Sequence, residues 1–430
     1  MKATNSLLLD KFLSSSGVST DTRKIQKGNL FFALQGPNFN ANILAKEALD
    51  KGAAYAIIDD AQYDTGEKTL LVDDALKALQ DLATSFRKTL HIPIIGLTGS
   101  NGKTTTKELI YAVLSQKYTC FATTGNLNNH IGVPLSILSI KQSDEIAVIE
   151  MGANKQGDIK ELVEIAQPTH GLITNIGKAH LEGFGGIEGV RKGKGELFDF
   201  LAAHSSTVFL PEIKNVVHEM HAEKAFKMTI LANHEMPIKL VSSTPTIIYQ
   251  TNTGEKITTH LPGTYNFENI QMAIAIGKHF KVTDEACNQG IRNYLPSNHR
   301  SQFIKSGSNQ VLMDAYNANP SSMTAAISHF AGTENEPKIL ILGDMYELGD
   351  ESTSEHNALG ELISNLQFEK ILLVGDQMQH ALTHLPKAFY FPDKFGLHNW
   401  LQDHPIKDSF ILIKGSRGIQ LESVLPFLAV

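Results

Sequence analysis

The segment GLTGSNGKTTTKE at residues 96–108 combines the residue types that hold phosphate groups. The N–H groups of a glycine-rich turn converge on an anion, and the N-terminus of a following helix adds partial positive charge. Lys103 is placed to reach the β and γ phosphates, and the Thr104 hydroxyl is placed to ligate Mg²⁺. The alternative is an ordinary glycine-rich turn, since a strict phosphate-loop motif has glycine where this chain has Leu97. We predict a nucleoside triphosphate site at Gly99, Asn101, Gly102, Lys103, Thr104 and Thr105.

A magnesium ion held by one hydroxyl needs further oxygen ligands and usually recruits carboxylates. Glu150 ends the apolar run IAVIE at 146–150, which places it at the carboxyl edge of a predicted parallel strand. His180, in NIGKAHLEGFG, follows the next predicted strand and is a candidate for a second metal position. An exposed strand end and a packed histidine are the alternatives. We predict that Thr104, Glu150 and His180 are metal ligands.

Two further groups of polar residues could bind ligands. The segment TTGNLNNHIGVP at 123–134 offers amides to substrate oxygens, with Asn126 and Asn128 as candidates and a plain loop as the alternative. His380 and His384 have the i, i+4 spacing of a zinc site but lack the neighbouring glutamate of the zinc motif. We expect His380 and His384 to lie on the solvent-facing side of a helix.

Strands and helices must alternate along the chain to position these residues. Apolar runs followed by helix-like segments are the signature of mostly parallel sheets, and this pattern recurs from residue 29 to residue 415. Strands are predicted at 29–34, 53–59, 92–97, 146–150, 171–176, 310–316, 338–344, 370–376 and 409–415. Amphipathic helices are predicted at 104–116 and 266–280. The strand spacing beyond residue 338 is typical of a Rossmann-like unit.

Length and composition set the frame for these elements. At roughly 150 residues per domain, 430 residues predict about three domains, which we place at 1–90, 91–297 and 298–430. A net charge of −7 argues against a general nucleic-acid or anionic-membrane surface. Cys120 and Cys287 lie far apart, which predicts no disulfide framework. No signal-peptide core and no 18-residue apolar run is evident, so a cytoplasmic protein without membrane insertion is expected.

Seven segments, taken in order, give the chain a resemblance to the Mur ligase family. They are GLTGSNGKTTTKE, TTGNLNNHIGVPLSIL, IEMGANKQGDI, NIGKAHLEGFG, LPGTYNFENIQMAIAIG, DAYNANPSSM and ILGDMYELGDES. The resemblance implies an α/β chain with a small N-terminal UDP-sugar domain, a central phosphate-loop ATPase domain with a parallel sheet, and a C-terminal Rossmann-like domain. In that family the last domain closes over the nucleotide.

The resemblance also implies roles for residues that the patterns alone do not single out. Lys194 in GVRKGKGELF matches the lysine that the family carries as a carbamate and would be a metal ligand, whereas the residues alone indicate a solvated basic patch. Thr22 and Arg23 would contact UDP. The residues implied around ATP and the second substrate are Asn269, Arg300, Asp314, Asn317 and Asn319, with Asp344, Glu347 and Lys414 on the dipeptide or phosphate side.

The activity implied by the resemblance is ATP-dependent amide formation through an acyl phosphate. The implied substrates are UDP-N-acetylmuramoyl-tripeptide and D-alanyl-D-alanine, with ATP, Mg²⁺ and a carbamylated Lys194 as the cofactors, and a monomer is expected. Alternatives are a tripeptide-forming Mur ligase, a folylpolyglutamate synthase, and a phosphate-loop protein that binds ATP without catalysis. Phosphate release that depends on the amine substrate would separate them.

Overall fold

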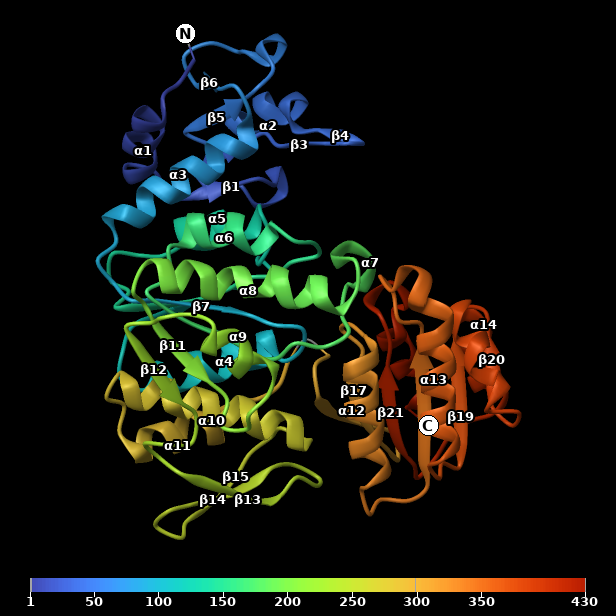
Figure 1. Cartoon of the computed structure of the whole chain (residues 1–430). Coiled ribbons are helices and arrows are strands. Elements are labelled where there is room, and N and C mark those ends of the chain that lie inside the picture. The colour runs from blue at the N-terminus through green and yellow to red at the C-terminus, as the bar shows by residue number, and fades with distance from the viewer. Residues whose placement is uncertain (1, 298, 430) are drawn as a thin grey trace.

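The computed structural model describes residues 2–297 and 299–429, which form three α/β domains. Figure 1 shows the N-terminal domain at the top, the central domain below it, and the C-terminal domain to the right of the central one. The chain passes from α3, which ends at Thr89, to β7, which begins at Ile94, so the boundary predicted at residue 90 falls between the first two sheets. The second predicted boundary falls at residue 298, which lies outside the described residues.

The N-terminal domain is built on a four-stranded parallel sheet in the order β1-β2-β5-β6. The two predicted strands form here as β2 and β5, and a two-stranded hairpin, β3–β4, projects from the domain (Figure 1). Helix α3 buries Leu79, Leu82, Ala83 and Phe86 in a core shared by the sheet and by helices of the central domain, and Asp74 caps its N-terminus by accepting from Lys77 N. The bounds are α1 Asn5–Leu13, β1 Val18–Ser19, η1 Thr22–Lys24, β2 Leu30–Phe32, β3 Gln35–Gly36, β4 Phe39–Asn40, η2 Ala41–Leu44, α2 Ala45–Asp50, β5 Tyr55–Ile58, η3 Ala61–Tyr63, β6 Thr69–Leu71 and α3 Ala75–Thr89.

The central domain contains a six-stranded parallel sheet in the order β12-β11-β10-β7-β9-β8. Neighbouring residues of its strands enter opposite cores, because side chains alternate along a strand. Ile94 packs in the core that includes α5, α6 and α8, whereas Ile95 packs in the core that includes α4, α10 and α11. The sheet is therefore covered on both faces, which explains its uninterrupted apolar strands.

A small antiparallel sheet of three strands, β13-β14-β15, completes the central domain and was not predicted. The bounds are β7 Ile94–Thr98, α4 Lys103–Leu114, β8 Cys120–Ala122, α5 Gly132–Leu138, β9 Ile146–Glu150, α6 Asp158–Ala166, β10 His170–Ile173, α7 Leu181–Phe184, α8 Ile187–Ala203, β11 Thr207–Leu210, α9 Val216–Ala222, β12 Met228–Leu231, β13 Ile238–Ser242, β14 Ile248–Thr251, β15 Lys256–Thr258, α10 Thr264–His279 and α11 Asp284–Asn293.

The C-terminal domain has a six-stranded sheet in the order β16-β17-β21-β18-β19-β20, parallel except for β16. The four predicted strands form as β17, β18, β19 and β21. His380 lies on η5, a 3₁₀ segment rather than an α-helix. The bounds are β16 Gln302–Ser306, β17 Asn309–Asp314, α12 Pro320–Ala331, β18 Lys338–Gly343, η4 Gly349–Glu351, α13 Ser352–Ser364, β19 Lys370–Val374, η5 Gln377–Thr383, β20 Phe389–Phe391, α14 Lys394–Asp403, β21 Phe410–Lys414, η6 Arg417–Ile419 and η7 Leu421–Leu428.

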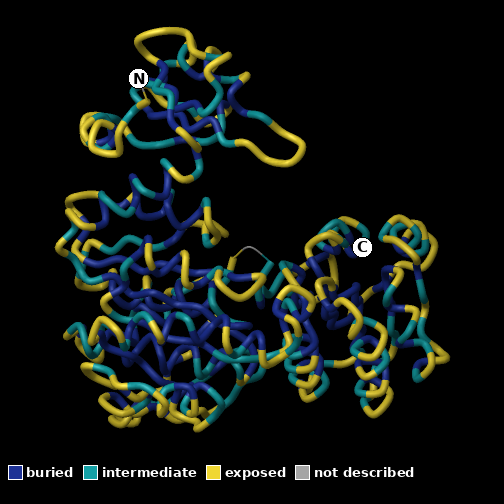
Figure 2. The backbone as a smooth tube through the Cα atoms, turned by 45° about the horizontal axis from the view of Figure 1, so that its top comes forward, coloured by how far each residue is buried: buried dark blue, intermediate teal, exposed yellow. Residues whose placement is uncertain are grey.

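Buried side chains join the first domain to the second. The Arg87 guanidinium, near the end of α3, donates to the carbonyls of Ala166 and Gln167 at 2.9 Å each, at the C-terminal end of α6. Figure 2 shows buried backbone through the interior of each domain and exposed loops around it. Across residues 2–297 and 299–429, no helix has the length and apolar character needed to cross a membrane.

Candidate functional site

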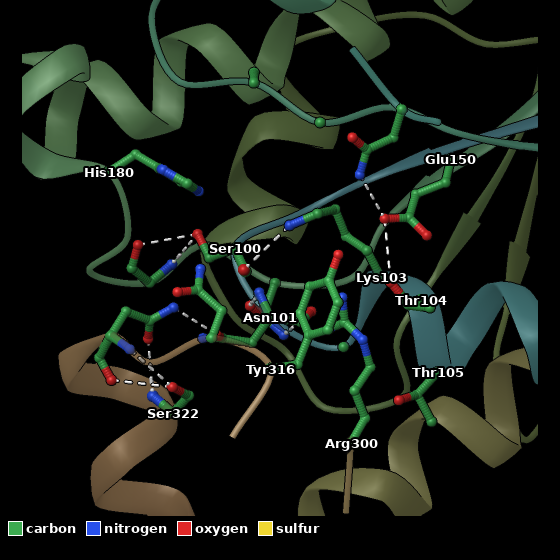
Figure 3. Close-up of a pocket in the computed structure, with 18 of the residues that line it drawn as sticks. Ser100, Asn101, Lys103, Thr104, Thr105, Glu150, His180, Arg300, Tyr316 and Ser322 are labelled. Carbon is green, nitrogen blue, oxygen red and sulfur yellow. Dashed lines mark hydrogen bonds between the residues drawn. The ribbon is translucent and has the colours of Figure 1, made fainter. Parts of the chain in front are cut away.

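A cavity of about 630 Å³ lies between the central and C-terminal domains. The carboxyl ends of β7, β9 and β10 reach it from one side, and those of β17 and β21 reach it from the other. This is the edge at which parallel sheets present their loops to ligands. Figure 3 shows the polar side chains of both domains converging there.

The glycine-rich turn after β7 forms the floor of the cavity. Gly99 has a φ of 150°, and a Cβ there would lie 1.9 Å from Thr174 Oγ1, so only glycine lets the turn approach β10 this closely. Gly102, with a φ of 78°, precedes α4 and is its N-cap. The backbone can therefore bend so that the first N–H groups of α4 face the cavity, where an anion is stabilised.

The Lys103 side chain folds back over this turn. Its Nζ donates to the carbonyls of Gly99 at 2.7 Å and Ser100 at 3.3 Å. Burial lowers the pKa of Lys103 to about 8, an effect that Glu150 opposes and the charge of Arg300 adds to. No carboxylate pairs with this ammonium among the described residues. It is consequently available to an anionic ligand.

Residues after β10 hold the turn in place, and the sequence patterns did not single them out. Asn175 accepts from Asn101 N through its Oδ1 at 3.0 Å, and its carbonyl accepts from Ser100 N at 2.9 Å. Ser100 Oγ also exchanges hydrogen bonds of 2.9 Å with the backbone of Gly177. The signal that could have found Asn175 is its place as a polar residue at the carboxyl end of the apolar strand predicted at 171–176.

Glu150 presents a carboxylate to the same cavity from the end of β9. The residue is 1% exposed, and its Oε1 accepts from Thr104 Oγ1 at 3.2 Å and from Asn128 Nδ2 at 2.8 Å. Its Oε2 is buried and has no hydrogen-bond partner within the described part of the chain. A buried carboxylate oxygen without a partner is costly, and a cation would remove that cost. The set of carboxylate, hydroxyl and amide oxygens suits Mg²⁺.

Lys194 is wholly buried on α8, so the alternative of a solvated basic patch is wrong for this residue. Gly193 permits the burial, because a Cβ there would lie 2.4 Å from the Phe184 ring of α7. Lys194 Nζ has no hydrogen-bond partner in the described residues and lies 5.2 Å from the centre of that ring. Burial lowers the pKa of Lys194 well below its ordinary value, and the charge of Lys103 adds to the effect. Burial therefore favours the neutral, nucleophilic form of this amine over its charged form.

His180 lies apart from Glu150, on the other side of the Lys103 side chain (Figure 3). Its Nδ1 is 2.5 Å from Glu347 Oε2 of the C-terminal domain but makes no hydrogen bond with the described residues. The nearby imidazole lowers the pKa of Glu347 against the opposing effect of burial. The described residues contain no cluster of three or more His, Cys, Asp or Glu side chains. The structure thus brings Thr104 and Glu150 together, whereas His180 marks a separate position on the cavity wall.

Arg300 and Asp314 face the cavity from the C-terminal domain. The Arg300 guanidinium lies 3.6 Å from the centre of the Tyr316 ring, and its Nε is buried without a hydrogen-bond partner in the described residues. Asp314 Oδ2 pairs with Lys414 Nζ at 2.5 Å, and its Oδ1 accepts from Ser301 N at 3.1 Å. Lys414 is only 2% exposed. The main role of Lys414 is therefore to orient Asp314, rather than to bind a ligand itself.

Asparagines complete the cavity wall. Asn319 Nδ2 donates to Asn101 Oδ1 at 2.7 Å and so joins the C-terminal domain to the phosphate-binding turn. Asn269 accepts from Thr106 at 3.0 Å, and its amide would lie 3.1 Å from a Cβ on Gly102. Asn126, Asn128 and Asn317 also line the cavity. These predicted residues are thus gathered around one space.

Some predicted residues lie elsewhere. Arg23 pairs with Asp21 at 2.8 Å and its side chain is 85% exposed, while the neighbouring Thr22 is buried. Neither lines the cavity, since both belong to the N-terminal domain. Asp344 is buried and does not line the cavity, and it accepts from Gln377 N and Met378 N at 3.0 and 2.8 Å. Burial raises the pKa of Asp344.

Comparison with known proteins finds the same family over most of the chain. A family model described as "Mur ligase middle domain" matches residues 97–277. A second, described as "Mur ligase, glutamate ligase domain", matches residues 299–417. The two matched segments contain every residue placed above in the cavity wall.

Full-length relatives give a more specific similarity. The UDP-N-acetylmuramoyl-tripeptide--D-alanyl-D-alanine ligase of Bacillus subtilis (strain 168) is 34% identical over 424 residues, covering 96% of this chain and 93% of the relative. The ligase of the same name from Escherichia coli (strain K12) is also 34% identical, covering 97% and 94%. A crystal structure of MurF from Acinetobacter baumannii superposes with a TM-score of 0.85 at 29% identity, covering 98% of both chains.

Proposed function

This chain belongs to the Mur ligase family, and on that premise we propose that it joins D-alanyl-D-alanine to UDP-N-acetylmuramoyl-tripeptide in the synthesis of peptidoglycan precursors. The observation that carries this proposal is the near-complete coverage of relatives with that name. A tripeptide-forming ligase or a folylpolyglutamate synthase would share the fold but not this set of relatives. The reaction uses ATP, and we assign it to the cytoplasm, where ATP and nucleotide-linked sugars are formed.

The reaction proceeds in two transfers. An oxygen of the tripeptide's terminal carboxylate attacks the γ-phosphorus of ATP, the bond to the β–γ bridging oxygen breaks, and ADP leaves. The amine nitrogen of D-alanyl-D-alanine then attacks the acyl carbon, the C–O bond to phosphate breaks, and the amine loses a proton. Both transfers depend chiefly on positioning and on neutralising charge, so the chain needs no covalent nucleophile.

Lys103 and the N–H groups at the start of α4 would hold the triphosphate. Among the described residues the ammonium donates to the carbonyls of Gly99 and Ser100, and a phosphate oxygen would offer it a stronger, charge-assisted bond. Arg300 reaches the cavity from the C-terminal domain and would bind the nucleotide together with Asp314. Docked domains would keep water from the acyl phosphate, whose hydrolysis would waste ATP.

Thr104 and Glu150 would hold magnesium, with His180 at a second metal position, and the oxygen donors of Thr104 and Glu150 fit this ion. Glu150 has a buried oxygen without a partner among the described residues and lies beside the Thr104 hydroxyl. Bound magnesium neutralises charge on phosphoryl oxygens. Thr104 and Asn128 would orient Glu150, because both donate to its other oxygen.

We further propose that Lys194 carries a carbamate. Its buried, neutral amine would attack carbon dioxide, forming an N–C bond and releasing one proton, and the product would be a carboxylate-like group. The observation that supports this is that Lys194 Nζ has no hydrogen-bond partner among the described residues. The carbamate would be an anion, and the positive charge of Lys103 would stabilise it. The carbamate would then join Glu150 as a magnesium ligand.

The N-terminal domain would bind the UDP end of the precursor, with Thr22 and Arg23 as contacts. Arg23 has an exposed guanidinium whose partner in the structure is Asp21, two residues before it. A diphosphate could take the place of that local pair, since exposed pairs of this kind contribute little to stability.

Phosphate release tests the proposal. The purified chain, with ATP and magnesium, should release phosphate with UDP-N-acetylmuramoyl-tripeptide only when D-alanyl-D-alanine is added. Folate with glutamate should give no release. Release with the second pair instead would identify a folylpolyglutamate synthase, and ATP binding without amine-dependent release would identify a non-catalytic protein.

A further inference from the structure

Lys107 is a buried cation in the segment GLTGSNGKTTTKE that has no role in the proposed mechanism. It lies on α4, one turn after Thr104, and is 0% exposed. Lysine side chains usually keep their ammonium group in water, so one that is buried to its end needs partners. Lys107 Nζ donates to the carbonyl of Thr123 at 2.5 Å and lies 2.8 Å from Glu108 Oε1. The ammonium therefore joins α4 to the chain that follows β8.

Thr123 connects this contact to Glu150. It directly follows β8 and is 1% exposed. Its N–H group donates to the carbonyl of Val148 at 3.0 Å, and its Oγ1 accepts from Glu150 N at 3.0 Å. Thr123 is thus held by β9 on one side and by Lys107 on the other, and its hydroxyl fixes the backbone of Glu150.

The segment after β8 also holds the carboxylate of Glu150. Asn128 Nδ2 donates to Glu150 Oε1 at 2.8 Å, and the Asn128 carbonyl accepts from Gly152 N at 2.7 Å. Residues 124–127, which lie between this asparagine and the residue bound by Lys107, are all exposed. An exposed segment has few packing contacts to hold it, so its geometry depends on its two ends. Lys107 fixes the first of those ends.

Thr104 connects the same carboxylate to the first turn of α4. Its hydroxyl donates to Glu150 Oε1 at 3.2 Å (Figure 3). Thr104 and Lys107 are three positions apart, so they lie on one face of the helix. Glu150 is therefore tied to α4 twice, directly through Thr104 and indirectly through Thr123. Because the phosphate-binding turn leads directly into α4, these contacts fix Glu150 relative to that turn.

We propose that Lys107 is a positioning residue that holds Glu150 in place relative to the phosphate-binding turn, acting through Thr123. The inference rests on the proposed function, in which Glu150 binds magnesium and the turn binds the triphosphate. Magnesium demands near-ideal octahedral geometry and is usually bound by one or two carboxylates together with substrate phosphates. A shift of the carboxylate away from the phosphates would therefore weaken the metal site. A lysine that only stabilised the fold would leave metal binding to the folded chain unaltered.

Two variants interrupt the proposed path at different steps. Lys107→Met keeps most of the apolar side chain and removes the ammonium group. Thr123→Val keeps the carbonyl that accepts from Lys107 but removes the hydroxyl that accepts from Glu150 N. The second variant therefore leaves the buried cation with its partners and breaks only the link to the carboxylate residue.

Lys338→Met is the matched control. Lys338 begins β18 in the C-terminal domain and is 5% exposed. Like Lys107, it donates to a backbone carbonyl, that of Ala331 at 2.9 Å, and it pairs with a nearby glutamate, Glu336, at 3.0 Å. It does not line the cavity. Its replacement therefore removes the same kinds of contact without changing the network around Glu150.

Binding of Mn²⁺ to the full chain with ADP, followed by electron paramagnetic resonance, tests the inference without turnover. Lys107→Met should weaken Mn²⁺ binding about 10-fold, the lower end of the range for residues that orient a metal ligand, because it acts through a second residue. Thr123→Val should give a smaller loss, and Lys338→Met should bind Mn²⁺ as the unaltered chain does. The affinity for ADP without metal, measured by calorimetry, should not change in any of the three, because the groups of the phosphate-binding turn are intact.

The double variant completes the test. Lys107→Met together with Thr123→Val should lose no more Mn²⁺ affinity than Lys107→Met alone, because both changes act on one path. Additive losses would overturn the inference, as would an equal loss in Lys338→Met. A weaker affinity of Lys107→Met for ADP without metal would also overturn it, since α4 as a whole would then be disturbed. If Lys107→Met does not fold, unaltered Mn²⁺ binding by Thr123→Val would overturn the inference.

The same titration separates the inference from the proposed function. Unaltered Mn²⁺ binding in both Lys107→Met and Thr123→Val would overturn the inference and leave the proposed function standing. An unaltered chain that binds no Mn²⁺ with ADP would overturn the proposed metal site and the inference together. Failure of the ligase assay alone would contradict the proposed function and leave the Mn²⁺ results as they are.

Discussion

Replacing Lys414 by methionine should leave the Asp314 carboxylate without its cation. The two side chains form an ion pair of 2.5 Å in which Lys414 is 2% exposed and Asp314 19% exposed. Removing one partner of such a pair costs about 3–5 kcal/mol, because the remaining charge stays poorly solvated. Of its partners in the described part of the chain, the Asp314 side chain would keep the hydrogen bond from Ser301 N, so we expect a loss of about 3 kcal/mol in the free energy of unfolding. The C-terminal domain should therefore unfold at a temperature lower by about 10 °C.

The single tryptophan of the chain makes the measurement specific. Trp400 lies on α14 and packs against Phe389 and Phe391 of β20, so its fluorescence reports unfolding of the C-terminal domain. Asp314→Asn together with Lys414→Met removes both charges, and most of the lost stability should return. The double variant should still bind nucleotide poorly, since Asp314 faces the cavity.

Lys338→Met serves as the control. Lys338 is also buried, but its partner Glu336 is 65% exposed and stays in water when the lysine is removed. The expected cost is about 1 kcal/mol. Equal destabilisation by Lys338→Met and Lys414→Met, or additive effects of the two changes at Asp314 and Lys414, would refute the reasoning that the buried charge pair is the cause.

Three further predictions concern the phosphate-binding turn, Lys194 and pH. Gly99→Ala should abolish ATP binding, measured by calorimetry, because its Cβ would lie 1.9 Å from Thr174 Oγ1; normal affinity would contradict the close-approach argument. Lys194→Ala should lose activity and regain part of it with short-chain carboxylic acids, and indifference to the acids would reject the carbamate. Burial lowers the pKa of His356, so the folded chain resists protonation that the unfolded chain accepts near pH 6.5. Stability read from Trp400 should thus fall as pH drops below 6.5, by at most about 1.4 kcal/mol per pH unit, and less in His356→Gln.

The sequence was most informative where function depends on neighbouring residues. The glycine-rich turn before α4, Lys103 and Thr104 lie within a few positions of one another in the sequence. Spacing alone therefore predicted that they form one site. Glu150 was found because it ends an apolar strand, and the carboxyl ends of parallel strands share one edge of a sheet. The apolar strands β7, β9 and β10 of the central sheet and β17, β18, β19 and β21 of the C-terminal sheet were predicted because both faces of these sheets are covered, whereas β11, which is also buried, was not.

Long-range packing explains what the sequence alone did not predict. Lys194 and Lys192 have similar neighbours in sequence, yet only Lys194 is buried, because Gly193 lets α7 approach α8 at that point. Strand β16 was missed because most of its residues are partly exposed, which gives no apolar run. The pairing of His180 with Glu347 joins positions 167 residues apart, and no local pattern signals it.

The hydrogen bonds that Arg87 makes between the first two domains have a consequence for the length of the substrate. Arg87 fixes the first domain to the C-terminal end of α6, whereas Asp158, the first residue of that helix, lines the cavity. The nine residues of α6 span about 13 Å, and a hydrogen-bonded helix does not stretch. If the first domain binds the uridine end of the precursor, α6 sets a fixed distance between that end and the cavity. The enzyme would then select precursors by length, because a peptide one residue too short would leave its carboxylate out of reach of the γ-phosphate.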